Sequence, residues 1–351
     1  MRAGRCTQSI NVAPFGAPRR FFHVLILTEE NLKSLLTMPD VIAAVEQGFL
    51  ALARGGARVP ERLCLSLPDD RAKVLLMPAY AEELSTDDGN GLGAKIVSVF
   101  PANTSRGLDV VQAIYLLLDS ETGVPLALMD GRFITAIRTA ATSALATKLM
   151  ATGGRKKLAV FGAGVQAEFH IEAMTVVADI ERVMIASRGT ARADLLASLV
   201  RARYGLACEV VSHATAASSG DLICTCTTAS EPLFDGRLLK PGTHVNAVGA
   251  FTPATRELDT VTMLRSRVIV DADSAAGKEA GEILIPAAEG HTGFVRGALA
   301  DVLTGAIPGR ISANEITVFR SCGLAIEDLM TARLACELAR MRGKNGVEVR
   351  L

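Results

Sequence analysis

The chain has 351 residues, of which 49% are hydrophobic, and its 37 basic side chains equal its 37 acidic side chains in number. A length of this order favours two domains. The charge balance provides no electrostatic attraction for nucleic acid or an anionic membrane surface, and no apolar run reaches the roughly 18 to 20 residues of a membrane-spanning helix. We therefore expect neither nucleic acid nor a membrane as a partner.

The seven cysteines show no pattern that would hold a metal or form a redox motif. None occurs in a Cys-x-x-Cys pair or at a metal-binding spacing from a histidine, so we expect free thiols, no metal and a reduced, cytoplasmic protein. The first 22 residues contain arginines but no acidic residue, which faintly resembles a transit peptide. Because Pro14, Gly16 and Pro18 interrupt any helix there, a disordered extension over residues 1–22 is the preferred interpretation.

The next segment, up to residue 138, is predicted to form a mostly antiparallel β domain with flanking helices. Thr28 caps a short helix over 29–36, and Pro39 opens a second helix in which Ile42, Val45 and Phe49 recur on one face. Turns rich in Asp, Gly, Asn and Ser separate the strands that follow. The predicted strands cover residues 23–27, 62–67, 74–78, 93–100, 110–118 and 126–129.

A helix over 133–150 is expected to join this β domain to a second domain spanning residues 139–324. Strands and helices alternate there, which predicts a Rossmann-type, doubly wound parallel sheet and makes the fold class α/β. Helices are expected at 282–288 and 294–303, and the segment 317–324 leads into a final helix over 325–341. That helix returns residues 325–351 to the first domain. The predicted parallel strands cover residues 157–162, 182–187, 208–212, 221–226, 243–248 and 267–271.

The start of the second domain carries a nucleotide-binding motif, Gly-x-Gly-x-x-Ala, between a strand and a helix. Gly162 permits the tight turn, Gly164 lets the backbone approach phosphate oxygens, and the small Ala167 lets the helix pack close to the strand. The helix N-terminus attracts the pyrophosphate. A structural glycine turn is the alternative, and the strand-turn-helix context favours the nucleotide site.

The end of the next strand indicates which nucleotide binds. An acidic residue there would accept a hydrogen bond from a free 2′-hydroxyl, but this chain has Ser187 and Arg188 instead. A hydroxyl and a guanidinium suit a 2′-phosphate, so NADP(H) is preferred and NAD(H) is the second choice. Alternatively, Arg188 is a solvated surface residue.

Five blocks then make the chain similar to the ornithine cyclodeaminase/mu-crystallin family. They occur in the order in which the family carries them. One family hosts several activities, so the resemblance does not fix the reaction. The blocks are GAKIVSVFPAN (93–103), MDGRFITAIRTAA (129–141), VFGAGVQA (160–167), HVNAVGAFTPATRELD (244–259) and ITVFRSCGLAIEDLM (316–330).

The resemblance implies a β domain that binds substrate and pairs two subunits in a homodimer, with the active site in the cleft beside the Rossmann domain. It places Arg62, Lys95 and Arg138 at the substrate, with Lys95 and Arg138 catalytic. Their cations suit a substrate carboxylate, and Lys95 could donate a proton if burial lowers its pKa. From the residues alone, structural ion pairs explain these cations equally well.

The resemblance also implies which residues contact the cofactor and the remaining substrate. Cys322 would approach the substrate, and packing suits it better than nucleophilic catalysis because no base is evident. The implied cofactor contacts are Arg138, Gly162, Ala163, Gly164, Val165, Gln166, Ser187, Arg188, Thr227, Val248, Gly249 and Ser321.

Two departures from the family pattern change the expected chemistry. Phe251 stands where ornithine cyclodeaminases carry an aspartate, and Leu75 replaces a second acid shortly before Met77-Pro78. Without these carboxylates the pocket loses general-base capacity, and Phe251 would instead contact the substrate ring. The pattern around Phe251 resembles Δ1-pyrroline-2-carboxylate reductases, which implies reduction of Δ1-pyrroline-2-carboxylate or Δ1-piperideine-2-carboxylate to proline or pipecolate.

Three other activities stay open within this resemblance. They are cyclodeamination of ornithine, an alanine dehydrogenase activity on pyruvate and ammonia, and nucleotide-dependent binding without catalysis. In every case the expected partner is a small imino or amino acid.

Overall fold

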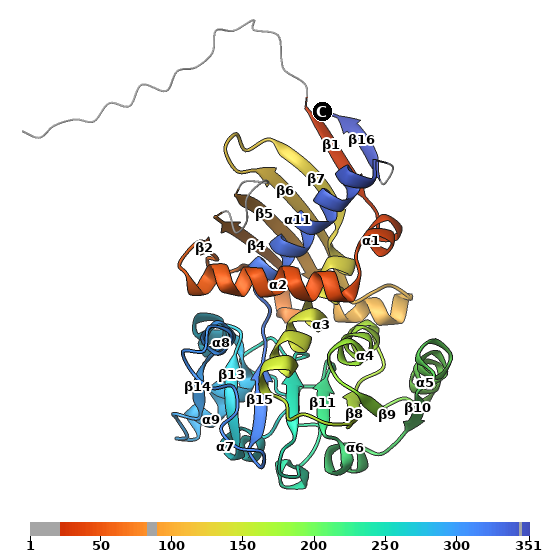
Figure 1. Ribbon diagram of the computed structural model, residues 1–351, viewed down its shortest axis with the longest axis vertical. Helices are drawn as coiled ribbons and strands as arrows, with labels where there is room; N and C mark the ends of the chain where they lie inside the picture. The colour runs from red at the N-terminus through yellow and green to blue at the C-terminus, as the bar shows by residue number, and fades with distance from the viewer. Residues whose placement is uncertain (1–21, 83–89, 344–345) are drawn as a thin grey trace, which may run out of the picture.

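The computed structural model describes residues 22–82, 90–343 and 346–351, and it contains two eight-stranded sheets. Figure 1 shows one sheet above the other along the long axis of the molecule. Residues 1–21, which make up nearly all of the expected extension, lie outside the described residues, as does Cys6.

The first sheet is mixed and mostly antiparallel, as predicted. Its order is β16-β1-β7-β6-β5-β4-β2, with β3 also paired to β4, and only β1 and β7 run parallel. Its strands are β1 (His23–Leu27), β2 (Ala57–Arg58), β3 (Leu63–Ser66), β4 (Lys73–Ala81), β5 (Gly91–Val99), β6 (Val111–Asp119), β7 (Pro125–Asp130) and β16 (Val347–Arg350).

The second sheet is parallel throughout, which confirms the Rossmann-type prediction. Its order is β10-β9-β8-β11-β12-β15-β13-β14, so the chain reverses direction across the sheet between β8 and β11. Its strands are β8 (Lys156–Phe161), β9 (Ile180–Ala186), β10 (Ala207–Val210), β11 (Leu222–Thr225), β12 (His244–Ala247), β13 (Ser266–Val270), β14 (Val295–Ala298) and β15 (Ile316–Arg320).

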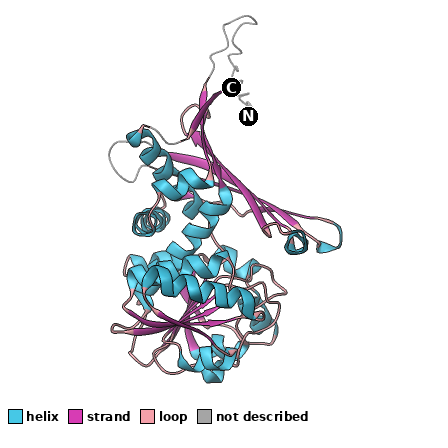
Figure 2. Ribbon diagram, turned by 90° about the vertical axis from the view of Figure 1, so that its right-hand side faces the viewer, coloured by secondary structure: helices cyan, strands magenta, loops and turns pink. Residues whose placement is uncertain are grey.

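Among the residues that the structure describes, helices cover one face of the first sheet (Figure 2). Helix α1 (Glu29–Leu35) starts at Thr28, whose hydroxyl accepts from the Asn31 N–H at 3.3 Å. Helix α2 (Met38–Ala53) buries the apolar face that its sequence predicts, and α11 (Ala325–Arg342) packs against α2 and the central strands.

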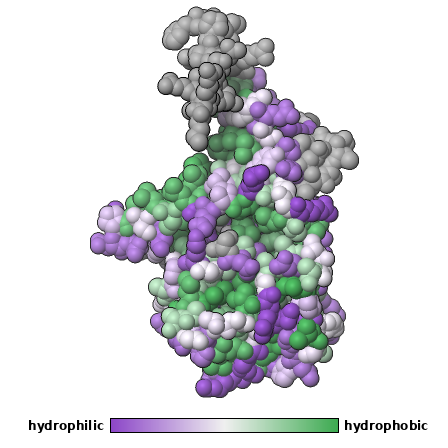
Figure 3. All heavy atoms as spheres, turned by 90° about the vertical axis from the view of Figure 1, so that its left-hand side faces the viewer, coloured by the Kyte–Doolittle hydropathy of each residue, from purple (hydrophilic) through white to green (hydrophobic). Residues whose placement is uncertain are grey.

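The opposite face of the first sheet carries exposed apolar side chains. Leu63, Leu76, Ile96 and Ile114 stand in register on four neighbouring strands, and each is at least 39% exposed. In Figure 3, hydrophobic groups run along the upper edge of the arm that projects to the left. A row of this kind marks a surface suited to a protein contact.

Alternate residues of the second sheet enter two hydrophobic clusters on its two faces. Helices α3, α4, α5 and α10 contribute to one cluster, and α6 and α7 to the other, as a doubly wound sheet requires. The helices are α3 (Gly131–Met150), α4 (Val165–Val177), α5 (Thr190–Tyr204), α6 (His213–Ser219), α7 (Thr260–Arg265), α8 (Asp273–Glu279), α9 (Gly281–Ala288) and α10 (Leu299–Leu303). Short 3₁₀ helices lie at η1 (Pro68–Asp70), η2 (Pro101–Arg106) and η3 (Gly236–Leu238).

Helix α3 connects the two sheets. Asp130 caps it by accepting from the N–H groups of Arg132 and Phe133. Its many small residues allow close packing against α4, and Thr147 accepts a hydrogen bond from the Asn246 side chain of β12 at 2.9 Å. The domain boundary that we predict at residue 138 therefore falls inside one continuous helix.

The structure contradicts one local prediction and adds a strand near the C-terminus. The expected helix over 294–303 divides into strand β14 and helix α10, because residues 295–298 pair with β13 and complete the sheet edge. Pairing with a neighbouring strand here overrides the local helical pattern. Strand β16 is absent from the prediction, although Val347 to Arg350 alternate apolar and polar residues and pair with β1.

A search of the described residues finds no individual helix whose length and apolar character would let it cross a bilayer. The bent pair α1 and α2, which meet at 90°, meets those criteria only when the two are taken together.

Candidate active site

The carboxyl ends of the parallel strands bring the expected cofactor residues to one edge of the second sheet. Gly162 follows β8, Ser187 follows β9, Thr227 lies two residues beyond β11, Val248 follows β12, and Ser321 follows β15. The reversal between β8 and β11 lies within this edge, between the strands that precede Gly162 and Thr227. Ligands of doubly wound folds bind at such a position.

The glycine motif has the geometry that its sequence predicts. Gly162 has a φ of +108°, and a Cβ there would lie 2.6 Å from the Cys226 carbonyl oxygen, so the turn requires glycine. A Cβ on Gly164 would meet nothing within 4 Å. Ala163 is half-buried, and Val165 is exposed at the start of α4. The open N-terminus of α4 therefore fits a pyrophosphate.

Gln166 and Ala167 complete this turn. Ala167 is fully buried against the sheet, as its small size predicts. The Gln166 side-chain oxygen is buried without a hydrogen-bond partner among the described residues, while its amide nitrogen lies 3.5 Å from the Thr135 carbonyl oxygen of α3. A buried, unpaired acceptor beside the open helix N-terminus is consistent with a ligand contact.

The two residues expected at the ribose follow β9. Ser187 is half-buried and Arg188 is exposed. Within residues 22–82, 90–343 and 346–351, the Arg188 guanidinium forms no recorded hydrogen bond or ion pair. Its donors are therefore available to a ligand.

A buried carboxylate, which sequence analysis misses, joins the ends of β11 and β12. Glu257 accepts hydrogen bonds from the backbone N–H and hydroxyl of Thr227 at 2.7 and 2.6 Å, and from the Gly249 N–H at 2.8 Å. Burial raises the pKa of Glu257, although these donors favour its charged form. Glu257 thereby fixes two of the loops that carry expected cofactor residues.

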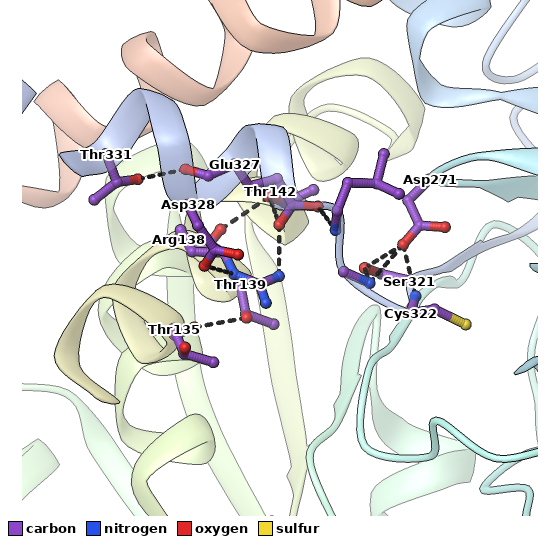
Figure 4. A network of polar contacts seen from close by, with 12 residues as sticks. Thr135, Arg138, Thr139, Thr142, Asp271, Ser321, Cys322, Glu327, Asp328 and Thr331 are labelled. Carbon is purple, nitrogen blue, oxygen red and sulfur yellow. Dashed lines mark hydrogen bonds and ion pairs between the residues drawn. The ribbon is translucent and has the colours of Figure 1, made fainter. Parts of the chain in front are cut away.

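The catalytic candidates Lys95 and Arg138 meet at one carboxylate, also missed in the sequence (Figure 4 shows the Arg138 side of this cluster). The Lys95 ammonium lies 2.8 and 2.7 Å from the two Asp328 oxygens, and Arg138 Nε donates to Asp328 at 3.0 Å. Arg138 Nη1 also donates to Glu327 at 2.7 Å. Asp328 and Glu327 are fully buried in the first turn of α11, so this helix sets the spacing of both cations.

Burial and charge shift the pKa values in this cluster in different directions. Burial lowers the pKa of Lys95 to about 8, although Asp328 opposes that change. Burial also disfavours the charge of Arg138, but Asp328 and Glu327 outweigh it and raise the pKa of the guanidinium. Burial raises the pKa of Glu327, which Arg138 partly counteracts. Lys95 is therefore a cation that can release a proton near neutral pH.

The loop after β15 approaches Arg138 closely. One Asp271 oxygen accepts from the Ser321 hydroxyl at 3.0 Å and from the N–H groups of Cys322 and Gly323 at 2.6 and 2.7 Å. A Cβ on Gly323 would lie 2.5 Å from Arg138 Nη1, so only glycine permits this approach. Burial raises the pKa of Cys322 to about 12, which keeps it a neutral thiol and favours packing over nucleophilic attack.

Arg62 lies across a pocket between the two parts of the molecule. Its Nε donates to Glu279 at 2.9 Å, Nη2 pairs with the other Glu279 oxygen, and Nη2 also donates to the Cys322 carbonyl oxygen at 2.9 Å. The pocket is lined by Val59, Pro60, Glu61, Arg62, Met77, Ala275, Lys278, Glu279, Gly323, Leu324 and Ala325.

The two positions that depart from the family pattern lie apart. Leu75 is buried on the helix-facing side of β4, where β5 also presents Lys95. Phe251 is half-buried in the loop after β12, and it is not among the described residues that line the Arg62 pocket. The structure thus brings Lys95, Arg138 and the Ser321 loop together but shows no contact of Phe251 with them.

One pair of the carboxylates that sequence analysis misses can be recognised in the sequence. Glu327 and Asp328 are adjacent acids between apolar residues of the predicted final helix, and buried acids require cations or hydrogen-bond donors. The chain contains 37 basic residues, so that signal does not name the partners. Asp271, Glu257 and Glu279 follow no pattern that identifies them.

Comparison with known proteins agrees with this architecture. The model of the ornithine cyclodeaminase/mu-crystallin family matches residues 23–343. A Δ1-pyrroline-2-carboxylate reductase of Bacillus cereus is 35% identical over 324 residues, which cover 91% of this chain and 98% of that protein.

Solved structures extend the agreement to three dimensions. Thermococcus litoralis Δ1-pyrroline-2-carboxylate reductase, in complex with NADH and L-proline, has a TM-score of 0.89 at 38% identity over 93% of this chain and 100% of that one. An archaeal alanine dehydrogenase dimer with bound NAD has a TM-score of 0.86 at 31% identity over 93% and 99% of the two chains. On the match of the family model and of full-length relatives, the chain belongs to the ornithine cyclodeaminase/mu-crystallin family.

Proposed function

We propose that this protein is an NAD(P)H-dependent reductase of small cyclic imino acids, converting Δ1-pyrroline-2-carboxylate, Δ1-piperideine-2-carboxylate or both to proline or pipecolate. The observation that carries this proposal is the buried pairing of Lys95 and Arg138 on Asp328, beside the Ser321 loop. Reductases that act on Δ1-pyrroline-2-carboxylate are among its full-length relatives.

The division of the chain follows from this role. Residues 23–138 and 325–351 would form the substrate-binding and dimerisation domain, and residues 139–324 the NAD(P)-binding domain. The proposed cofactor residues lie on loops of the second sheet, while Arg62 and Lys95 belong to the first sheet or its loops. The substrate would therefore bind where the two parts meet.

We assign a role in this reaction to each of the three cations and to Phe251. Arg62 would hold the substrate carboxylate, because a guanidinium binds a carboxylate through paired hydrogen bonds. Lys95, kept protonated at neutral pH by a pKa of about 8, would donate its proton to the ring nitrogen. Arg138 would orient the substrate, and Phe251 would contact its ring. The bound reduced nicotinamide supplies the hydride that adds to C2.

The cofactor proposed is NADP(H), with NAD(H) also accepted. The exposed Arg188 guanidinium supports NADP(H), because it is available for a 2′-phosphate. The structurally similar reductase and dehydrogenase bind NADH and NAD, which supports acceptance of NAD(H).

Cyclodeamination of ornithine is disfavoured because Phe251 and Leu75 supply no carboxylate for the amine steps. Reduction of pyruvate with ammonia is the second candidate, because an archaeal alanine dehydrogenase shares 31% identity and the whole fold. Its substrate also presents a carboxylate next to a reducible carbon, so Arg62 and Lys95 could serve both reactions.

A substrate panel tests the proposal. Purified protein is mixed with NADPH or NADH and with Δ1-pyrroline-2-carboxylate, Δ1-piperideine-2-carboxylate, or pyruvate plus ammonium, and nicotinamide absorbance is followed. We expect the highest kcat/KM with a cyclic imine. Faster turnover of pyruvate would select alanine dehydrogenase, ammonia release from ornithine would select cyclodeamination, and inactivity with every substrate would leave only binding.

Lys95→Met should lower kcat by at least about 100-fold, because general acid catalysis typically contributes this much. In the unmodified protein kcat should fall as the pH rises above about 8, since the protonated ammonium is the active form. Lys148→Met removes an exposed lysine paired with Glu46 and serves as the control. Retention of activity and of the alkaline limb in Lys95→Met would exclude Lys95 as the acid.

Arg188→Ala should raise the KM for NADPH roughly tenfold or more, because a charge-assisted bond to the 2′-phosphate is lost. The KM for NADH should change by less than about twofold. Arg106→Ala, which removes an exposed arginine at the end of η2, controls for net charge. Equal effects on both cofactors would refute the 2′-phosphate contact.

We also propose a homodimer formed through the open face of the first sheet. The apolar row Leu63, Leu76, Ile96 and Ile114 supports it, as does the dimer recorded for the archaeal relative. Sedimentation should give about twice the 36.9 kDa chain mass, and Ile96→Lys should give the monomer. Leu195→Lys, at a 71% exposed site on α5, should leave the dimer intact. A monomeric parent protein, or a dimeric Ile96→Lys variant, would contradict the proposal.

A further inference from the structure

Every cation expected to receive the substrate carboxylate already has a carboxylate partner. Arg62 pairs with Glu279, Lys95 with Asp328, and Arg138 with both Glu327 and Asp328. The three positive and three negative charges balance. An anionic substrate can therefore bind strongly only if one of these internal carboxylates moves away from its cation. Otherwise the negative charge of the substrate would have no positive partner.

Two of the three carboxylates are held too firmly to move. Glu327 and Asp328 side chains are fully buried. Glu327 also accepts from the Leu324 N–H at 2.8 Å and from the Thr142 hydroxyl at 2.9 Å, and Asp328 serves two cations at once. Removing a buried carboxylate from its cation leaves a charge unpaired in a dry environment, which is strongly unfavourable.

Glu279 differs in exposure, in its partners and in its position. Its side chain is 27% exposed, and within the described part of the chain Arg62 is the only recorded hydrogen-bond partner of its carboxylate. It is the last residue of α8, where the helix dipole disfavours a negative charge. It also lines the pocket, from which it can turn toward solvent.

The contact between Glu279 and Arg62 has the form expected for a bound substrate. Two carboxylate oxygens face Nε and Nη2 of one guanidinium, which is the paired geometry that a substrate carboxylate would use. The same guanidinium also donates to the Cys322 carbonyl oxygen, so Arg62 is positioned beside the loop that approaches Arg138. Glu279 thus occupies the groups that the substrate needs.

We propose that Glu279 is an internal stand-in for the substrate carboxylate, which the substrate displaces from Arg62 when it binds. The inference rests on the proposed function, in which Arg62 receives that carboxylate. Displacement makes the carboxylate a requirement for entry, because an uncharged imine cannot compete with Glu279 for the guanidinium. Glu279 thereby sets the affinity of the site without taking part in the chemical step.

The test is Glu279→Gln, which keeps the shape of the side chain but removes the charge that competes for Arg62. We expect the KM for Δ1-pyrroline-2-carboxylate to fall roughly three- to tenfold, since a partly exposed ion pair is lost, and kcat to stay within about twofold. Glu46→Gln is the matched control, because Glu46 is 30% exposed and pairs with Lys148 at 3.3 Å away from the pocket. Its KM should be unchanged.

Glu61→Gln measures the part of the effect that comes from charge alone. Glu61 lines the same pocket but pairs with Lys278 rather than with Arg62. The fall in KM should be clearly smaller than in Glu279→Gln. An unchanged or raised KM in Glu279→Gln would overturn the inference, because Glu279 would then only hold Arg62 in place. An equal fall in KM in Glu61→Gln would also overturn it, because the effect would then come from the negative charge alone and not from competition for Arg62.

A binding measurement separates this inference from the proposed reaction. Acetate is titrated by calorimetry into the NADH-loaded protein, with no turnover required. Glu279→Gln should bind acetate more tightly than the parent protein, and adding Arg62→Gln should abolish that gain. If the parent protein fails to reduce any cyclic imine, the proposed function fails, while the acetate result still decides whether Glu279 competes for Arg62.

Discussion

The candidate active site depends on two buried carboxylates at the start of α11. Asp328 and Glu327 are fully buried, and the three bonds that they accept from Lys95 and Arg138 fix those cations relative to each other. Breaking one partner of a buried pair typically costs about 3–5 kcal/mol. This helix starts directly after the loop that carries Ser321, Cys322 and Gly323, so one short segment positions both expected substrate and cofactor groups.

Much of the fold can be predicted from patterns that neighbouring residues form in the sequence. The alternation of strands and helices after residue 155 predicts a parallel sheet, and the period-two strands before it predict the antiparallel one. Strands β14 and β16 are not predicted from such patterns. Both are edge strands of four residues. Strand β14 pairs with the preceding strand, β13, across helices α8 and α9, whereas β16 pairs with β1, the first strand described.

The residues of the candidate site also differ in whether the sequence predicts them. The glycine turn and the strand-end residues can be located from the sequence, because local geometry requires their residue types. The partners of the cations cannot, since Asp328 lies 233 positions from Lys95 and 190 from Arg138. Sequence analysis therefore predicts a cationic cleft, whereas the structure shows that each of these cations is paired with a carboxylate of the protein.

The continuity of α3 has a consequence for motion. Within the described residues the chain passes between the two sheets only twice, through α3 and through the segment 321–324. A twenty-residue helix that packs against both sheets resists bending in its middle, where Arg138 lies. Any hinge rotation must then be absorbed at the ends of α3 and in the 321–324 segment, which contacts Asp271 and approaches Arg138. Lys95 and Asp328 lie on the same side of that segment, whereas Arg62 and Glu279 lie on opposite sides, so opening would keep the first pair together and separate the second.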